Sequence, residues 1–368
     1  MRLIFTGGGT GGHVNPAVAM ATAMLDKHPD CEVLFIGRSG GGENRAVSAA
    51  GLKMTTLDVS GIRRSIAPSN IKSIAKAIRA EFSARKLLRD FKPDAVIGTG
   101  GYVCWPVLHA ANVLSITTLI HESNVYPGLV TRLLASKCDR VLLNSAETAE
   151  HLNRRARTVT VGNPLRRDFG RISRAEARGR LGIRGDEILL LSFGGSIGAQ
   201  KMNEACIDVM RSLSVKDRRI RHLHACGDRY FEIYRNDTLS KGMRGCKILP
   251  YIEDMPSILP AADIVICRCG AMTLSEITLL GIPAILIPSP NVTGNHQYKN
   301  GKRLSDVGAA LLIEEQELSG ALLTDRLRAL ISDSDRRRMM SSRMKGLGTP
   351  EATKMCIRSI KEVVNARQ

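Results

Sequence analysis

The stretch LIFTGGGTGGH at residues 3–13 decides how this chain folds. An apolar run suited to a β-strand leads directly into a glycine loop that ends at His13. Glycines placed after a strand and before a helix let backbone amides approach a phosphate group, as in the first turn of nucleotide-binding sheets. A second stretch, LLSFGGSIGA at residues 190–199, repeats the pattern half a chain later. The sequence therefore predicts two domains that open alike.

Short apolar runs of β type recur between segments of helical period, which is the pattern of a parallel sheet with crossover helices. The runs lie at residues 3–5, 33–36, 54–57, 95–97, 117–120, 140–142, 158–161, 188–193, 222–225, 247–249, 264–267, 284–287 and 310–313. We expect an α/β protein with two Rossmann-like doubly wound domains. The turn-forming residues VGNP at 161–164 place the boundary between residues 1–163 and 164–348. A last helical segment, within residues 349–368, is expected to pack back on the first domain.

The composition narrows the function classes. A length of 368 residues suits two domains, and a net charge of +18 attracts nucleic acid, anionic lipid or phosphorylated substrates. Aromatic residues make up only 4% of the chain, which argues against binding single strands by base stacking. The nine cysteines form no CxxC pair, so reduced thiols are expected. We expect no signal peptide, and the apolar run at 279–287 is too short to span a bilayer.

The first glycine loop also matches the GxGxxG fingerprint of dinucleotide-binding enzymes. That function needs an acidic residue about 20 positions on, at the end of the second strand, to hold a ribose. Here the second strand is followed by Gly37 and Arg38. Because an arginine suits a 2′-phosphate, an NADP-dependent enzyme stays an alternative. His13 is either a cleft residue at the carboxyl edge of the sheet or a helix-start residue with a local bond.

Six ordered motifs carry a resemblance over essentially the whole chain. They are GGTGGH at 8–13, GGYV at 100–103, HESN at 121–124, GGSIGA at 194–199, GAMTLSE at 270–276 and NHQ at 295–297. The chain resembles the bacterial transferases that add N-acetylglucosamine (GlcNAc) to undecaprenyl-pyrophosphoryl-MurNAc-pentapeptide, completing the lipid-linked peptidoglycan unit. The resemblance implies two Rossmann-like domains facing each other across a cleft (GT-B), with the acceptor lipid on the first and UDP-GlcNAc on the second.

The same resemblance implies an inverting transfer that uses no cofactor and no metal ion. The one D-x-D, at residues 333–335, is interpreted as a helix start. The enzyme would work at the cytoplasmic face of the inner membrane, on its anionic surface, together with other proteins of cell-wall synthesis and division. Nucleic acid is not an expected partner, because it would leave the glycine loops unexplained.

Site residues follow from the motifs. His13 is the expected base, and Glu122 is either a competing base or a carboxylate that orients the strand end. The acceptor would contact Gly9, Gly100, Gly101 and Tyr102. The donor would contact Thr10, Gly11, Gly12, His13, Asn124, Arg166, Ser196, Ile252, Met255, Ala271, Met272, Thr273, Glu276 and Gln297.

Seven of the donor residues have a particular expected partner under this resemblance. Ser196 and Arg166 would hold the diphosphate, and Glu276 would accept the ribose hydroxyls. Asn124 and Gln297 would contact the GlcNAc hydroxyls. Ile252 and Met255 would line the uracil pocket; without the resemblance they are ordinary core residues, and Arg166 is a surface arginine.

Two positions depart from the family pattern. Cys269 stands where a small residue without a thiol is usual, and Cys104-Trp105 follows the GGYV motif where smaller residues are usual. Neither removes a proposed functional group. Trp105 would either touch lipid or fill space.

Residues 71–91 combine a helical apolar face, at Ile71, Ile74, Ile78 and Phe82, with many basic residues, and Arg63 and Arg64 precede them. A basic amphipathic helix is typical of membrane surfaces, although a solvated surface helix has the same pattern. Three rival functions remain: a related glycolipid transferase, a UDP-GlcNAc epimerase and a nucleic-acid-binding protein.

Overall fold

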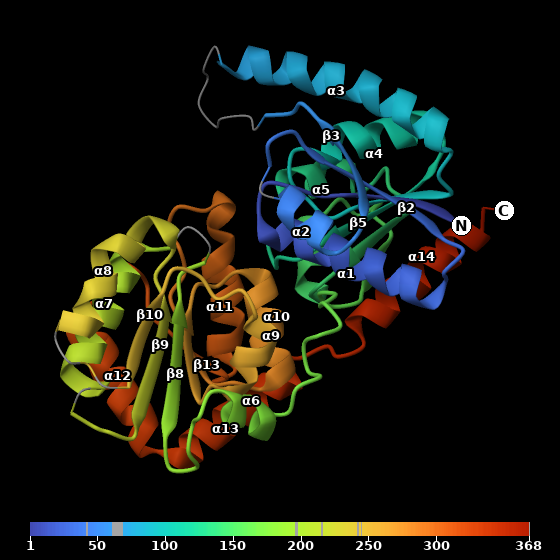
Figure 1. Ribbon diagram of the computed structural model, residues 1–368. Coiled ribbons are helices and arrows are strands. Elements are labelled where there is room, and N and C mark those ends of the chain that lie inside the picture. Colours follow the sequence, from blue (N-terminus) through green and yellow to red (C-terminus); the bar gives the residue numbers. More distant parts are fainter. Residues whose placement is uncertain are drawn as a thin grey trace. The chain divides into compact units, whose positions relative to one another are not determined.

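The computed structural model describes residues 1–41, 43–60, 69–195, 198–214, 216–240, 243 and 245–367. The chain divides into two compact units (Figure 1). Unit 1 is Met1–Arg167 together with Thr349–Gln368, and unit 2 is Asp168–Gly348.

The first boundary follows Arg167. The VGNP turn had placed residues 164–167 in the second domain, whereas they belong to unit 1. Local contacts explain the difference. The Leu165 carbonyl accepts a hydrogen bond from the Thr353 hydroxyl at 3.1 Å, and Arg167 pairs with Asp26 at 2.5 Å. The segment after the turn is therefore held by unit 1 before the chain enters unit 2.

Unit 1 contains seven parallel strands in the order β3-β2-β1-β4-β5-β6-β7. The strands are β1 (Arg2–Thr6), β2 (Glu32–Arg38), β3 (Lys53–Leu57), β4 (Ala95–Gly98), β5 (Thr117–Glu122), β6 (Arg140–Leu143) and β7 (Thr158–Thr160). Its helices are α1 (Gly11–Lys27), α2 (Glu43–Ala49), α3 (Ser69–Phe91), α4 (Cys104–Val113), α5 (Leu129–Leu134) and α14 (Ala352–Asn365).

Both faces of the central strands are buried, which is why a strand such as β4 is a continuous apolar run. Side chains alternate along β1: Leu3 and Phe5 face a core shared with α1, α2 and α14, whereas Ile4 faces a core shared with α3, α4 and α5. All three residues have no exposed surface. The parallel order brings the carboxyl ends of β1, β4 and β5 to one edge of the sheet, where ligands bind in such folds.

Unit 2 repeats the plan with six parallel strands in the order β10-β9-β8-β11-β12-β13. The strands are β8 (Ile188–Phe193), β9 (Ile220–Ala225), β10 (Cys246–Leu249), β11 (Ile264–Cys267), β12 (Ala284–Leu286) and β13 (Ala310–Leu312). The helices are α6 (Arg174–Arg180), α7 (Gln200–Val209), α8 (Asp228–Ser240), α9 (Met255–Ile258), α10 (Ala271–Leu280), α11 (His296–Asp306), α12 (Gly320–Ser332) and α13 (Ser334–Gly346). Every predicted strand is present, and the predicted α/β fold class is confirmed.

The C-terminal helix α14 belongs to unit 1 and lies beside α1 (Figure 1). Cys356 and Ile360 are completely buried in the core that α14 shares with β1 and α1. Arg140, at the start of β6, donates to the Ser359 hydroxyl at 3.3 Å and pairs with Glu362 at 3.0 Å. The chain thus returns from unit 2 to complete unit 1. Within the described ranges, no helix is long and apolar enough to cross a membrane.

Candidate active site

Two glycine turns meet at the carboxyl edge of the first sheet. One joins β1 to α1 and contains Gly8; the other follows β4 and contains Gly100 and Gly101. The Gly8 amide donates to the Gly100 carbonyl at 3.2 Å. Gly101 has a φ of +86°, and a Cβ there would lie 2.1 Å from the Gly8 carbonyl oxygen. Only a residue without a side chain fits this approach, so the two turns are interlocked through their backbones.

His13 stands on the first turn of α1, against this pair of turns. Its Nδ1 lies 3.1 Å from the Gly8 carbonyl oxygen. Because a carbonyl oxygen only accepts, Nδ1 donates this hydrogen bond, and Nε2 is the ring nitrogen left to face a ligand. The Thr99 hydroxyl donates to the His13 carbonyl at 2.5 Å. A Cβ at Gly100 would lie 2.6 Å from Cδ2 of the ring. The imidazole is thus held from two sides.

The remaining residues expected at this edge of unit 1 lie on the same two turns. Gly9 has a φ of +90°, and Thr10 precedes the first residue of α1, so Gly11 and Gly12 are in its first turn. First-turn amides lack partners within the helix and suit an anion. Tyr102, on the second turn, is 48% exposed and available to a ligand. The structure therefore brings together His13 and the predicted acceptor residues.

Glu122 ends β5 and is only 5% exposed. Its Oε1 accepts from the Asn124 amide at 3.0 Å and from the Asn124 side chain at 3.1 Å. Its Oε2 accepts from the Gly128 amide at 2.9 Å and from the Thr131 hydroxyl at 2.7 Å. Four donors occupy the four acceptor sites that a carboxylate offers. This carboxylate therefore shapes the turn that carries Asn124, and Thr131 ties the turn to α5.

In unit 2, the glycine loop after β8 also packs closely against the backbone of a neighbouring segment. Gly195 has a φ of +90° and Gly198 a φ of +77°. A Cβ at Gly198 would lie 2.1 Å from the Cys226 carbonyl oxygen, at the end of β9. The loop is thus pressed against the neighbouring strand end. Ser196 lies outside the described residues.

Helix α10 begins at the carboxyl end of β11, the strand beside β8. Ala271 and Met272 are buried in its first turn, while Thr273 and Glu276 are half-buried. Residues three apart share one helical face, so Thr273 and Glu276 lie on one side of α10. The positive end of the helix suits a diphosphate, and the carboxylate of Glu276 suits hydroxyl groups.

The other predicted donor residues occupy varied settings. Gln297, at the start of α11, accepts from the Ser289 amide at 2.9 Å, which orients its side chain. Ile252 is 3% exposed and packs with Met255 in the apolar core of unit 2, as expected of core residues. Arg166 is exposed and belongs to unit 1. The predicted donor set is therefore divided between the two units.

Sequence reasoning missed several residues that support the site. Arg268 donates to the carbonyls of Ile287 and Pro288, each at 3.2 Å, and pairs with Glu315. It thereby links the turns at the ends of β11, β12 and β13. The sequence also showed no sign that the Thr99 hydroxyl bonds the His13 carbonyl. A residue that acts through backbone carbonyls distant in sequence leaves no local pattern.

A buried polar cluster in unit 2 was also missed. The Ser192 hydroxyl lies 2.8 Å from Nε2 of His222 and 2.7 Å from Nδ1 of His224. Burial lowers the pKa of His222 to about 3 and that of His224 to about 4, so both rings are neutral near pH 7. Because the cluster is fully enclosed between strands and helix α7, it is structural.

The two departures from the family pattern are accommodated inside the fold. The Cys104 thiol donates to the Thr6 carbonyl at 3.1 Å, and Cys269 is buried against Gly301, where a Cβ would lie 2.7 Å from its sulfur. Trp105 is half-buried, packs against the core of unit 1 and stacks on His109 with ring centroids 5.0 Å apart. These contacts fit a space-filling role for Trp105.

Comparisons with known proteins agree with this geometry. Models of the glycosyltransferase family 28 N-terminal and C-terminal domains match residues 3–143 and 189–355. A UDP-N-acetylglucosamine–N-acetylmuramyl-(pentapeptide) pyrophosphoryl-undecaprenol N-acetylglucosamine transferase of Alkaliphilus metalliredigens is 40% identical over 343 residues, 93% of each chain. The crystal structure of Acinetobacter baumannii MurG has a TM-score of 0.77 and 28% identity, covering 98% of this chain and 99% of that one.

A putative UDP-N-acetylglucosamine 2-epimerase from Listeria monocytogenes has a TM-score of 0.72 over 98% of this chain and 95% of its own. At 13% identity it shares the fold alone. The two parallel-sheet domains and these structural neighbours confirm the predicted GT-B fold. Because the matches with family 28 and with the transferases extend over nearly the whole sequence, the chain belongs to the family of UDP-N-acetylglucosamine–N-acetylmuramyl-(pentapeptide) pyrophosphoryl-undecaprenol N-acetylglucosamine transferases.

Proposed function

We propose that this chain transfers GlcNAc from UDP-GlcNAc to the C4 hydroxyl of MurNAc in undecaprenyl-pyrophosphoryl-MurNAc-pentapeptide, with inversion at C1. The printed names of its relatives give the substrates. In this molecule the proposal rests on how the imidazole of His13 is held. Its Nδ1 is engaged by a backbone carbonyl and its Nε2 is left as the basic nitrogen, at the ligand-binding edge of the first sheet.

The chemistry is a single displacement. The MurNAc hydroxyl attacks C1 of GlcNAc, its proton passes to Nε2 of His13, and UDP leaves with the electrons of the C1–O bond. The bond from Nδ1 to Gly8 would stabilise the imidazolium that forms. We assign the acceptor side to Gly9, Gly100, Gly101 and Tyr102.

Glu122 has a different role in this proposal. Since its four acceptor sites are occupied, taking a further proton would break a bond that holds the turn. We therefore assign it to positioning Asn124, which would contact the GlcNAc hydroxyls, and leave general base catalysis to His13.

The donor would bind to unit 2 through its diphosphate and ribose. Amides of the loop at 194–199 and the first turn of α10 (Ala271, Met272 and Thr273) would neutralise the diphosphate without a metal ion, helped by Ser196 and by Arg166. Thr10, Gly11 and Gly12 on unit 1 would also contact the donor. Glu276 would accept the ribose hydroxyls, Gln297 would contact GlcNAc, and Ile252 and Met255 would line the uracil pocket.

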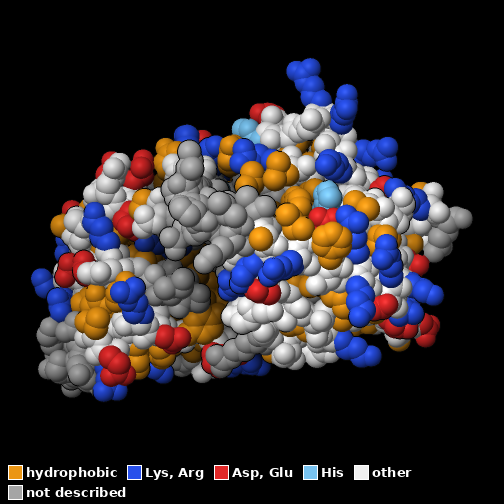
Figure 2. Space-filling model, turned by 90° about the horizontal axis from the view of Figure 1, so that it is seen from above, with side chains coloured by type: hydrophobic (Ala, Val, Ile, Leu, Met, Phe, Trp, Pro, Cys, Tyr) orange, Lys and Arg blue, Asp and Glu red, His pale blue; other side chains and the backbone are white. Residues whose placement is uncertain are grey.

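Helix α3 is the proposed membrane contact. Its buried residues include Ala80, Ala84 and Leu88, whereas two other large apolar residues point outward. Ile78 is 49% and Phe82 65% exposed. Exposed Arg79, Lys86 and Arg89 lie on the same helix, and Figure 2, which views this side, shows orange and blue side chains intermingled. Apolar and cationic side chains together suit an anionic bilayer.

One buried carboxylate fixes this helix to its neighbour. Burial acts to raise the pKa of Glu81, but bonds from Arg85 and His109 outweigh it and lower that pKa. His109, on α4, lies 3.0 Å from the Glu81 carboxylate. The side chains of Ile71, Lys72 and Ile74, like Arg63 and Arg64, fall outside the described residues, and Lys76 pairs with Asp58 at 3.0 Å.

We propose that the enzyme works at the cytoplasmic face of the inner membrane, with other cell-wall synthesis and division proteins as partners.

Replacing His13 tests the chemistry. With UDP-GlcNAc and a short-chain lipid acceptor, His13→Ala should lower turnover by about 10²- to 10⁴-fold, because a general base contributes that much. UDP affinity should stay nearly intact. Glu122→Gln is the comparison: it should lower the unfolding temperature and cost less turnover than His13→Ala. If His13→Ala kept more than half of the wild-type turnover, the base would lie elsewhere.

Replacing Glu276 tests the donor site. Glu276→Gln should weaken UDP binding, measured by calorimetry, by about tenfold or more, since a hydrogen bond to a charged group is lost. The control is Asp306→Asn, which removes a carboxylate of the same unit that pairs only with exposed Lys302 among the described residues. Equal UDP affinity in both folded variants would refute the ribose assignment.

Reversing charge on α3 tests the membrane contact. Arg79→Glu with Lys86→Glu should strongly reduce sedimentation with anionic vesicles at low salt, since each basic residue near such a surface contributes roughly 1 kcal/mol. Activity on a water-soluble acceptor should persist. The matched control is Lys216→Glu with Arg326→Glu, two exposed positions of unit 2. Vesicle binding lost equally in both pairs would show that only net charge matters.

A further inference from the structure

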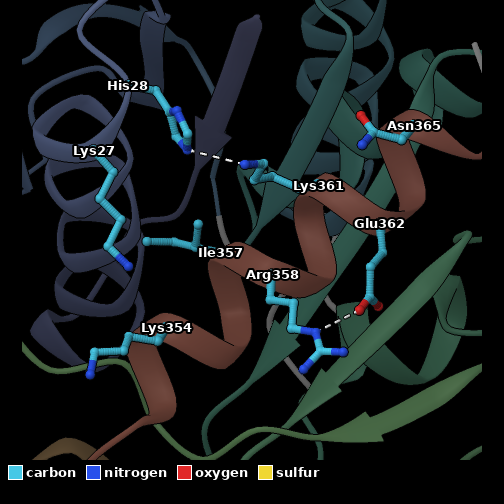
Figure 3. A pocket seen from close by; sticks show the side chains of 8 residues that line it. All are labelled: Lys27, His28, Lys354, Ile357, Arg358, Lys361, Glu362 and Asn365. Carbon is cyan, nitrogen blue, oxygen red and sulfur yellow. Dashed lines mark hydrogen bonds and ion pairs between the residues drawn. The ribbon is translucent and has the colours of Figure 1, made fainter.

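A basic groove lies between the end of α1 and one face of α14, both in unit 1 (Figure 3). Its volume is about 340 Å³. Lys27 and His28 form one wall, and Lys354, Arg358 and Lys361 form the other. The last three are spaced i, i+4 and i+7, which places them on one helical face. Ile357 forms an apolar floor and is only 4% exposed.

The groove is separate from the candidate active site. Helix α1 starts at Gly11 beside the glycine turns and ends at Lys27. With a rise of 1.5 Å per residue, these ends lie about 24 Å apart. Arg140, which pairs with the groove residue Glu362, stands at the start of β6. The groove therefore opens near the amino ends of the strands, away from the edge that carries His13.

Structural ion pairs account for only part of this charge. Lys354 pairs with Glu351 at 2.8 Å, and Arg358 pairs with Glu362 at 2.9 Å. Lys27 and Lys361 differ: across the part of the chain that the structure describes, neither lies within ion-pair distance of a carboxylate. The Lys361 ammonium instead lies 3.4 Å from Nε2 of His28, to which it donates (Figure 3). A lysine beside an imidazole is a weakly compensated cation that an anionic ligand would stabilise.

We propose that this groove binds the phosphate groups of a soluble oligophosphate ligand. Cations on both walls, beside an apolar floor, suit a ligand with several negative charges close together. A single carboxylate would compensate only one of the two lysines, Lys27 and Lys361, that have no carboxylate partner among the described residues. A bilayer is disfavoured as the occupant because the apolar side chain of the groove, Ile357, is buried and cannot insert. Phosphate oxygens would accept from Lys27 and Lys361, and the Arg358 guanidinium would add charge-assisted bonds.

The test uses the full chain and inorganic tripolyphosphate as the probe. In lysine acylation followed by mass spectrometry, the probe should slow modification of Lys27 and Lys361, but not of Lys53 and Lys137. These two are exposed lysines of unit 1 outside the groove. Because this readout is resolved by residue, binding of the probe at a donor site does not confuse it. The proposal is thus tested independently of the transferase activity.

Calorimetry at about 150 mM salt, where the Debye length is about 8 Å, adds a second readout. Lys27→Gln with Lys361→Gln should weaken one tripolyphosphate site by about tenfold or more. Lys53→Gln with Lys137→Gln removes the same charge and should leave that site intact, and circular dichroism verifies folding of both. Equal losses in both pairs, or no slowing of acylation at Lys27 and Lys361, would overturn the proposal. Protection by phosphatidylglycerol vesicles but not by tripolyphosphate would assign the groove to lipid headgroups and also refute it.

Discussion

The contact between Gly8 and Gly100 is the constraint on which the first unit's site depends. Two turns from neighbouring strands approach so closely that a single methyl group at Gly101 would overlap the Gly8 carbonyl oxygen. That carbonyl also accepts from the His13 ring, so the backbone contact, the ring tautomer and the start of α1 are fixed together. Thr99 completes the arrangement by bonding the His13 carbonyl. Here glycine serves close packing as much as phosphate binding.

Unit 2 has the same strand order, but the glycine loop after its first strand contacts the neighbouring strand on the opposite side. In unit 1 the glycine loop touches the turn after β4, on the side of the sheet that leads to β5 and Glu122. In unit 2, Gly198 instead presses on the Cys226 carbonyl at the end of β9. Because Gly198 contacts β9 and not the turn after β11, the start of α10 can receive a diphosphate in the proposed function. The duplicated loops thus serve different ligands in this account, although their sequences look alike.

Sequence alone predicted the strands because both faces of the central strands are buried, so that runs such as Ile264–Cys267 are apolar throughout. Contacts between residues that are distant in sequence could not be predicted from the sequence alone. The segment before the boundary at Arg167 is held by a bond to Asp26, and the exposure of Phe82 follows from the packing of α3 through Ala80, Ala84 and Leu88. For Glu122 the sequence left two roles open, and its four hydrogen-bond donors could be located only in the structure. The site residues proposed here remain predictions from motifs, placed now on their elements.

Substitution of Gly100 tests most directly whether the interlocked turns hold the imidazole of His13, the base in the proposed function. In Gly100→Ala the new methyl group would meet His13 at 2.6 Å, whereas Gly51→Ala, also at positive φ, meets nothing within 4 Å. Both should lose some stability through backbone strain. Turnover should fall by about 10²-fold in Gly100→Ala alone, since displacement by an ångström is enough for such a loss, with UDP affinity unchanged. Turnover equal in the two variants would contradict the account.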